Sequence, residues 1–164
     1  MDIWEANSIS QALTSHTCSK EGLYKCEGTD CGDIATNERY DGVCDKDGCD
    51  LAPYRSGNTD FFGPGSDFTV DSSQKMTVVT QFITEDGTDE GDLVEIRRLF
   101  VQNGKVIKVP DATYGGKTYN SISDDMCAAQ KLVFNETNDN LAKGGMKSIG
   151  EAMERGMVLV MVSE

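Results

Sequence analysis

Two carboxylates near the start of the chain, Asp2 and Glu5, are the first residues that could perform chemistry together. Hydrolysis of a glycosidic bond needs two carboxyl groups, one protonated as the acid and one ionised as nucleophile or base. On a regular strand, residues three apart point to opposite faces, because side chains alternate with a period of two. A β-bulge between them would turn both toward one cleft, since bulges re-aim side chains beside active sites. The spacing alone favours ordinary solvated carboxylates.

Strands are the elements expected to position these carboxylates. A short strand is predicted over residues 1–7, and a longer one over residues 76–84, where β-branched residues are frequent. Apolar runs at residues 93–102 and 105–109 flank Asn103-Gly104, a dipeptide that favours a tight hairpin. The carboxylates are therefore expected at the start of a chain built mainly from strands.

Helices and loops complete the expected pattern. Helices are predicted at about residues 123–134, where a serine precedes two acids, and at about 143–155, which has an apolar face. Residues 157–162 are apolar without alternation, which indicates a strand buried on both faces. Residues 8–65 and 110–122 show little periodicity and are expected to be loops. Strands joined by long loops favour an all-β sandwich.

Composition excludes some classes of partner. The chain has 164 residues, enough for one core of ordinary domain size, and 38% of them are hydrophobic. The formal net charge of −13 argues against nucleic acid and against an anionic membrane surface, because both require Lys and Arg. No apolar run approaches the roughly 20 residues that span a bilayer. No signal peptide is visible in the sequence.

Six cysteines indicate covalent cross-links. Five of them lie between Cys18 and Cys49, and Cys127 stands apart. An even number of cysteines in a loop-rich acidic chain favours disulfides formed in an oxidising compartment. A zinc site would need clustered Cys-x-x-Cys or Cys/His spacing, and the chain has a single histidine, His16. Disulfides are therefore predicted, no metal or cofactor is expected, and the 15 possible pairings remain open.

Three short motifs follow one another from Asp2 to Cys18: D-x-x-E, A-N-S and H-x-C. Together they resemble, in register, the motif E-x-D-x-x-E followed by A-N-S and H-x-C of glycoside hydrolase family 7, a family of cellulases. The first Glu of that motif would precede Met1. The further matching segments extend to the end of the chain: residues 44–49, 53–55, 57–59, 62–65 and 156–161.

This resemblance implies a curved jelly-roll β-sandwich, similar to concanavalin A, with long disulfide-linked loops and short helices. It implies that residues 1–164 are the central part of a single catalytic domain, truncated at both ends. A chain that lacks the nucleophilic Glu is expected to be inactive by itself. The resemblance also implies three disulfides: Cys18–Cys44, Cys26–Cys31 and Cys49–Cys127.

The resemblance further implies that individual residues take part in hydrolysis of β-1,4-glucosidic bonds in cellulose with retention of configuration. Glu5 is expected to be the acid/base, and Asp2 to position the nucleophile, the Glu absent before Met1. Trp4 is expected to be packed structure. Without the resemblance, the remaining polar residues would be interpreted as loop residues and solvated charges. The residues expected to bind the cellulose chain are Thr14, His16, Arg39, Asp47, Asp50 and Arg55.

The length of one segment favours a cellobiohydrolase, which releases cellobiose. The family's endoglucanases shorten the segment after the H-x-C cysteine, whereas residues 19–43 form a long one that resembles the cellobiohydrolase loop. Ala35 stands where many cellobiohydrolases have a Tyr at the loop tip, so the loop is expected to close less tightly over substrate. An endo-β-1,4-glucanase of the same family remains an alternative.

A non-catalytic glucan-binding module is an alternative of a different class. A glutamate encoded upstream of Met1 would favour the enzyme over this module, because the module needs no nucleophile. The parent enzyme is expected to be secreted, extracellular and monomeric, with cellulose or cello-oligosaccharides as its partner.

Overall fold

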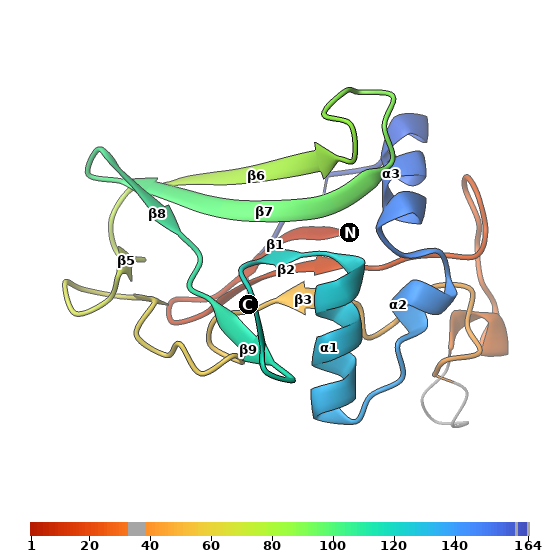
Figure 1. Cartoon of the computed structure of the whole chain (residues 1–164), viewed down its shortest axis with the longest axis horizontal. Helices are drawn as coiled ribbons and strands as arrows, with labels where there is room; N and C mark the ends of the chain where they lie inside the picture. Colours follow the sequence, from red (N-terminus) through yellow and green to blue (C-terminus); the bar gives the residue numbers. More distant parts are fainter. Residues whose placement is uncertain (33–38, 160, 164) are drawn as a thin grey trace.

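The structure of the chain, a computed structural model, describes residues 1–32, 39–159 and 161–163. Its main strands form two sheets that lie face to face (Figure 1). The first sheet has the order β12-β1-β2-β3, from Met161–Ser163, Asp2–Ala6, Gln11–Ser15 and Cys49–Leu51. The second sheet has the order β11-β7-β6, and β8 also pairs with β7. The bounds of its strands are Ser121–Ile122 (β11), Leu93–Gln102 (β7), Thr77–Thr84 (β6) and Lys105–Lys108 (β8).

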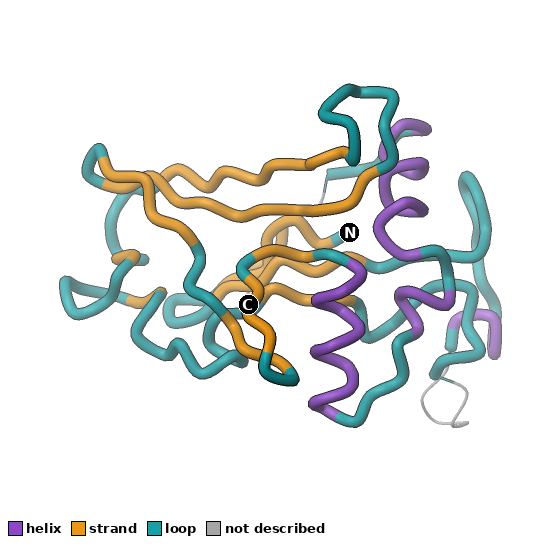
Figure 2. Tube along the Cα trace, in the orientation of Figure 1, coloured by secondary structure: helices purple, strands orange, loops and turns teal. Residues whose placement is uncertain are grey.

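Smaller elements surround the two sheets. The strands β4 and β5 pair in parallel, and β9 and β10 form an antiparallel hairpin, from Phe62–Gly63, Val70–Asp71, Ala112–Tyr114 and Lys117–Tyr119. A 3₁₀ turn and three helices complete the described chain, from Gly28–Cys31, Asp124–Phe134 (α1), Asp139–Ala142 (α2) and Gly145–Arg155 (α3). The helices α1, α2 and α3 gather at one end of the strands, while loops occupy much of the remaining surface (Figure 2).

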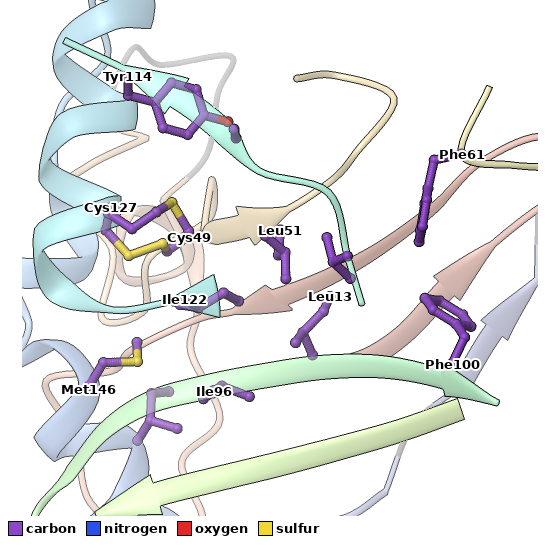
Figure 3. Packing of buried hydrophobic residues seen from close by; sticks show 14 of the residues in the cluster. Leu13, Cys49, Leu51, Phe61, Ile96, Phe100, Tyr114, Ile122, Cys127 and Met146 are labelled. Atoms are coloured by element: carbon purple, nitrogen blue, oxygen red, sulfur yellow. A yellow bond between two sulfur atoms is a disulfide. The ribbon is translucent and has the colours of Figure 1, made fainter. Parts of the chain in front are cut away.

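The core lies between the two sheets. Ile96 and Phe100 point inward from β7 and are fully buried, as is Leu13 from the facing strand β2. Leu51 of β3 adds to the same cluster (Figure 3). Trp4 of β1 meets the Phe100 ring edge-on, with ring centroids 6.2 Å apart. The expectation that Trp4 is packed structure is therefore confirmed, and its burial fixes the inner face of β1.

Three disulfides brace the loops. Cys49 of β3 is bonded to Cys127 of α1, and this bridge joins the first sheet to the helical end (Figure 3). The structure also contains the Cys18–Cys44 and Cys26–Cys31 bonds within the long segment between β2 and β3. These are the pairings that the family resemblance implied.

Several elements agree with the sequence prediction. The strand β6 and the hairpin of β7 and β8 lie where the β-branched runs predicted them. Asn103 and Gly104 both have positive φ, 52° and 73°, which suits the two central residues of a tight hairpin turn. Ser123 caps α1, because its hydroxyl accepts a hydrogen bond from the Met126 amide at 3.2 Å.

Two segments predicted as loops contain strands. Residues 8–65 include β2, β3 and β4, and residues 110–122 include β9, β10 and β11. Most of these strands have only two or three residues, too few to show an alternating pattern. The longer β2 is buried on both faces along most of its length, so its side chains do not alternate in polarity. Gly115-Gly116 adopts positive φ and closes the β9–β10 hairpin.

The end of the chain also differs from the prediction. Residues 157–162 were expected to form a strand buried on both faces, yet strand pairing is limited to β12, and Val158 and Leu159 are 86% and 65% exposed. In the described chain β12 lies at the edge of its sheet, and no second layer covers these side chains. The helix predicted at about residues 143–155 is α3, which starts at Gly145. Gly144 is its N-cap residue, with a φ of 108°, and separates it from the short helix α2. None of the described helices has the length and apolar character needed to cross a membrane.

Candidate active site

A β-bulge in β1 determines where the two carboxylates point. Asp2 pairs with Thr14 of β2, but Glu5 pairs with Ala12, so two residues of β1 lie opposite a single residue of β2. The extra residue reverses the alternation of side chains along β1. Asp2 and Glu5 consequently share one face of the sheet, as the sequence argument required for joint chemistry.

Two polar residues of β2 and its extension contact this carboxylate pair. The Thr14 hydroxyl donates to Glu5 Oε2 at 2.6 Å, and His16 Nε2 lies 2.8 Å from Asp2 Oδ2. Thr14 and His16 are two residues apart on extended backbone, so they share a face. The four residues therefore form one contiguous polar cluster, which we call the carboxylate cluster: Asp2, Glu5, Thr14 and His16.

The contacts of His16 determine how protons are arranged in the carboxylate cluster. His16 Nδ1 lies 2.8 Å from the backbone oxygen of Asp45, and a carbonyl oxygen can only accept, so Nδ1 carries a proton. The contact between Nε2 and Asp2 then needs one further proton, held either by the ring or by the carboxyl group. The hydrogen bond between His16 Nε2 and Asp2 Oδ2 thus contains one proton, and either atom can be its donor.

A tight turn from Asp45 to Gly48 packs against His16. The carboxylate of Asp45 accepts hydrogen bonds from the amides of Asp47 and Gly48, both at 3.0 Å. Gly48 has a φ of 72°, and a Cβ there would lie 2.4 Å from Thr14 Cγ2 and 2.7 Å from His16 Cε1. The turn therefore packs directly on the carboxylate cluster and requires glycine at this position.

Arg39 forms an ion pair with Asp47, a residue of that turn. Arg39 Nε donates to Asp47 Oδ1 at 2.6 Å, and the side chains are 31% and 18% exposed. Burial acts to raise the pKa of Asp47, but the hydrogen bond and charge of Arg39 outweigh it and hold that pKa below its ordinary value. The same hydrogen bond raises the pKa of Arg39. Both residues remain charged at neutral pH.

Asp50 and Arg55 belong to a second, larger network of charges. Arg55 donates to Asp50 Oδ1 at 2.6 Å and to Glu136 Oε1 at 2.9 Å, and its guanidinium lies 4.2 Å from the centre of the Phe134 ring. The buried Lys131 ammonium donates to Glu136 Oε2 at 2.9 Å. Burial raises the pKa of Asp50, against the opposing charges of Arg55 and Lys131.

The register of three strands connects Asp50 to the carboxylate cluster. Asp2 pairs with Thr14, and Thr14 pairs with Asp50 of β3, so the three side chains stand in one row on one face. Two strand spacings separate the ends of this row, which is about 10 Å. The sheet therefore aligns the carboxylate cluster with the Asp50–Arg55 pair, and the Asp45–Gly48 turn brings the Arg39–Asp47 pair next to it.

Sequence reasoning missed three of the charged residues in this region: Asp45, Lys131 and Glu136. The Asp45 carboxylate contacts the nearby amides of Asp47 and Gly48, as in an ordinary turn, and Lys131 contacts Glu136 across a separation of 5. The contact between Arg55 and Glu136 spans 81 positions, and their local sequence contains no motif that would indicate it. Ala35, expected at the tip of the long loop, lies outside the described residues. In the described parts of the chain, no group of three or more His, Cys, Asp or Glu side chains is arranged to hold a metal ion.

Known proteins provide the context for this geometry. The sequence model of glycosyl hydrolase family 7 matches residues 1–163, and the chain belongs to this family. A family 7 cellobiohydrolase from Daphnia pulex is 53% identical, with a TM-score of 0.88, over 94% of this chain and 35% of that chain. The match with a solved family member agrees with the predicted all-β sandwich with disulfide-linked loops and short helices.

Two further enzymes, an endocellulase and a cellobiohydrolase, are also similar to the chain. The native endocellulase EGI of Humicola insolens is 40% identical, with a TM-score of 0.81, over 96% of this chain and 36% of that chain. A cellobiohydrolase from Melanocarpus albomyces, complexed with cellotetraose, is 34% identical, with a TM-score of 0.79, over 94% of this chain and 34% of that chain. The chain thus spans about a third of the length of these solved chains, and they include both kinds of cellulase.

Proposed function

We propose that the chain is the central part of a single catalytic domain that hydrolyses β-1,4-glucosidic bonds in cellulose with retention of configuration. The observation that carries this proposal is the bulge in β1, because it turns Asp2 and Glu5 to one face within a family that includes cellulases. A binding module would have no need for this arrangement, since two carboxyl groups on one face are what glycoside hydrolysis requires.

Glu5 is the proposed acid/base. Its Oε2 accepts a hydrogen bond from the Thr14 hydroxyl. This bond fixes the orientation of the Glu5 carboxyl group and leaves Oε1 to act on substrate. In the first step Glu5 would protonate the glycosidic oxygen as the bond to the anomeric carbon breaks. In the second step the Glu5 carboxylate would remove a proton from the water that attacks the glycosyl-enzyme.

Asp2 is proposed to position the nucleophile and to share a proton with the carboxyl group of that nucleophile. The nucleophile is assigned to the first Glu of the family motif, which is not among the 164 residues. His16 holds Asp2 through Nε2, while its Nδ1 is held by the Asp45 carbonyl. Because both ring nitrogens are engaged, His16 would donate to a sugar hydroxyl only after releasing Asp2. Its first role is therefore to orient Asp2.

The charged pairs are proposed to bind the leaving cellobiosyl unit. Guanidinium and carboxylate groups suit sugar hydroxyls, because they offer planar donors and acceptors in fixed geometry. These residues line one side of the carboxylate cluster and retain partial exposure, so hydroxyls can compete for their hydrogen bonds. The proposed substrate-binding residues are Thr14, His16, Arg39, Asp47, Asp50 and Arg55.

Release of cellobiose is proposed over internal cleavage. The segment between Cys18 and Cys44 is long, as in the family's cellobiohydrolases, and the Daphnia pulex cellobiohydrolase is 53% identical where the Humicola insolens endocellulase is 40% identical. The three disulfides support secretion, because such bonds persist in oxidising compartments. Cellulose or a cello-oligosaccharide is the proposed partner.

Stereochemistry and product distribution test this proposal in the full-length enzyme that contains this chain. Proton NMR during hydrolysis of cellopentaose should detect the β-anomer of the new reducing end first, because two displacements restore the configuration. Crystalline cellulose should yield mainly soluble cellobiose, and carboxymethyl cellulose should lose little viscosity.

Each outcome separates the proposed function from its alternatives. First appearance of the α-anomer would contradict the retaining mechanism. A rapid fall in viscosity with few soluble products would identify the endoglucanase instead. Binding to cellulose without any hydrolysis would identify the glucan-binding module.

A further inference from the structure

Arg98 is a buried cation that the proposed mechanism does not use. It occupies the inward-facing row of β7, between the buried Ile96 and Phe100, and is 1% exposed. Burial lowers its pKa to about 10, and in the described chain no carboxylate opposes that effect. A guanidinium in an apolar row is costly unless its donors are satisfied. The presence of an arginine at this buried position therefore requires a specific explanation.

The donors of Arg98 reach across the core to the opposite sheet. One terminal nitrogen donates to the backbone carbonyl of Ile3, and the other lies 3.5 Å from Gln11 Oε1. Nε donates to Thr80 Oγ1 on the neighbouring strand at 3.2 Å. The guanidinium also lies 5.5 Å from the centre of the Trp4 ring. Three of these four contacts belong to β1 and β2, the strands that carry the carboxylate cluster.

Ile3 lies inside the bulge between Asp2 and Glu5. In the described register it pairs with no residue of β2 or β12, whereas Asp2 and Glu5 both have partners in β2. A bulge leaves backbone groups without ladder partners, and a buried carbonyl without a donor is unfavourable. Arg98 supplies the donor at this point and stacks on Trp4, the other residue of the bulge.

We infer that Arg98 is a positioning residue: it fixes the bulge of β1 and thereby turns the Glu5 side chain to the face that carries Asp2. This inference rests on the proposed hydrolysis, in which Glu5 must reach the glycosidic oxygen. An apolar side chain would complete the row of Ile96 and Phe100 without the cost of burying a charge. The specific contribution of Arg98 is therefore its contact with the bulge.

Arg98→Met in the full-length enzyme tests the inference, because methionine fills the row but cannot donate to the Ile3 carbonyl. A misplaced acid is most harmful when the leaving group needs protonation. On phenyl β-cellobioside, kcat/KM should fall about 10–100-fold, since a displacement near 1 Å can cost up to about 100-fold. On dinitrophenyl β-cellobioside, whose leaving group needs little protonation, the loss in kcat/KM should stay within about threefold. The comparison uses kcat/KM, which reports the first step, because Glu5 is also the proposed base of the second step and its displacement would lower kcat on both substrates.

Gln102→Met is the matched control. Gln102 is buried in the same row of β7, but its amide bonds to the backbone of Asp71, away from β1. This variant should lower the melting temperature without changing the ratio of the two rates. Equal losses on both substrates for Arg98→Met, or a ratio unchanged from the parent enzyme, would overturn the inference.

Arg98→Lys gives the answer if Arg98→Met does not fold. A lysine ammonium keeps the charge but lacks the planar fork that reaches Ile3, Thr80 and Gln11 together. The rate ratio should shift in the same direction by at least about threefold, and an unchanged ratio would overturn the inference. If the parent enzyme hydrolyses neither cellobioside, or if Glu5→Gln leaves both rates intact, the proposed function fails instead.

Discussion

The carboxylate cluster and the arginine–aspartate pairs lie beside each other but are held in place by different means. Asp2 and Glu5 are directed by a bulge in a paired strand, and they are contacted by His16, just after β2, and by Thr14 of β2. The Arg39–Asp47 and Asp50–Arg55 pairs involve long side chains that keep partial exposure. Backbone pairing tolerates little displacement, whereas exposed ion pairs exchange partners easily.

This difference suits two different tasks. Proton transfer requires a carboxyl group within hydrogen-bond reach of one atom, so it benefits from a position set by strand register. Sugar binding requires donors and acceptors that leave a protein partner when a hydroxyl arrives. Changes in the carboxylate cluster should therefore lower kcat, and changes in the charged pairs should alter KM or product inhibition.

The largest expected effect is that of Glu5→Gln in the full-length enzyme. Hydrolysis of cellulose should fall about 10²–10⁴-fold, because the sugar leaving group is no longer protonated. Dinitrophenyl β-cellobioside should react in its first step at a nearly normal rate, and the glycosyl-enzyme should then accumulate. Azide should restore turnover and yield a β-glycosyl azide, which thin-layer chromatography and NMR can identify.

Two further variants isolate the role of Glu5. Asp2→Asn should lower turnover by misplacing the nucleophile, and azide should not rescue it. Glu154→Gln, an exposed carboxylate on α3, should change neither rate. Azide rescue of Asp2→Asn in place of Glu5→Gln would exchange the two roles and contradict the assignment.

The second expected effect concerns the bonds that support the charged pairs. Cys49 directly precedes Asp50, and the Cys49–Cys127 bond closes a loop with a sequence separation of 78, against 5 for Cys26–Cys31. In the chain-entropy account, replacing the first pair by alanine should cost roughly 4.5 kcal/mol and replacing the second roughly 2 kcal/mol. Chemical denaturation under non-reducing conditions measures both costs. Equal costs would show that loop length does not determine the contribution of these bonds.

A smaller effect is expected for Arg39→Ala, which tests the binding role of the charged pairs. Loss of a charge-assisted hydrogen bond, worth roughly 1.5–3 kcal/mol, should raise the inhibition constant of cellobiose at least tenfold. The kcat on dinitrophenyl β-cellobioside should remain close to that of the parent enzyme. Arg97→Ala is the control, because Arg97 forms a similar pair with Glu95 on β7, away from the site. Unchanged inhibition in Arg39→Ala would remove Arg39 from the product side.

The same contrast explains what the sequence could predict. The D-x-x-E, A-N-S and H-x-C motifs are local, so they could support a family resemblance, and that resemblance implied roles for Asp2, Glu5, Thr14 and His16 without a structure. The D-x-x-E spacing alone favoured solvated carboxylates. The bulge was only a hypothesis at that stage, because strand register depends on a partner strand that the motif does not specify. The contact between Arg98 and the bulge spans 95 positions and has no local pattern at all.

The charged pairs were predictable only through the family resemblance. Arg39, Asp47 and Arg55 lie in turns, where charged residues are ordinarily solvated, and no spacing rule distinguishes them from surface residues. The short strand β3, which aligns Asp50 with Asp2, has three residues and shows no period. Longer elements such as β6, β7 and α1 were predicted because each contains enough residues to reveal its pattern.

The smallest expected effect separates the two charged pairs from each other by their response to pH. The pKa of Asp47 is lowered in the folded chain, so its contribution to stability is present above its ordinary pKa, near 3.9, and is lost as pH falls through the lower folded value. The pKa of Asp50 is raised by burial, so its contribution is present below the ordinary pKa and is lost as pH rises through the folded value. As pH falls through the carboxyl range, the contribution of Asp47 to the free energy of unfolding should therefore decrease, and that of Asp50 should increase.

Melting temperatures of Asp47→Asn and Asp50→Asn, measured in the full-length enzyme from about pH 3 to pH 7, test this contrast around the ordinary carboxyl pKa. The destabilisation caused by Asp47→Asn should be greatest at pH 7 and shrink toward pH 3, because the lost ion pair with Arg39 matters only while Asp47 is ionised. The difference between Asp50→Asn and the parent should instead become more favourable to the variant as pH rises, because asparagine avoids the ionisation of a buried carboxyl group. Parallel curves for the two variants would mean that burial and ion pairing act alike at both positions, and the distinction between the two pairs would be lost.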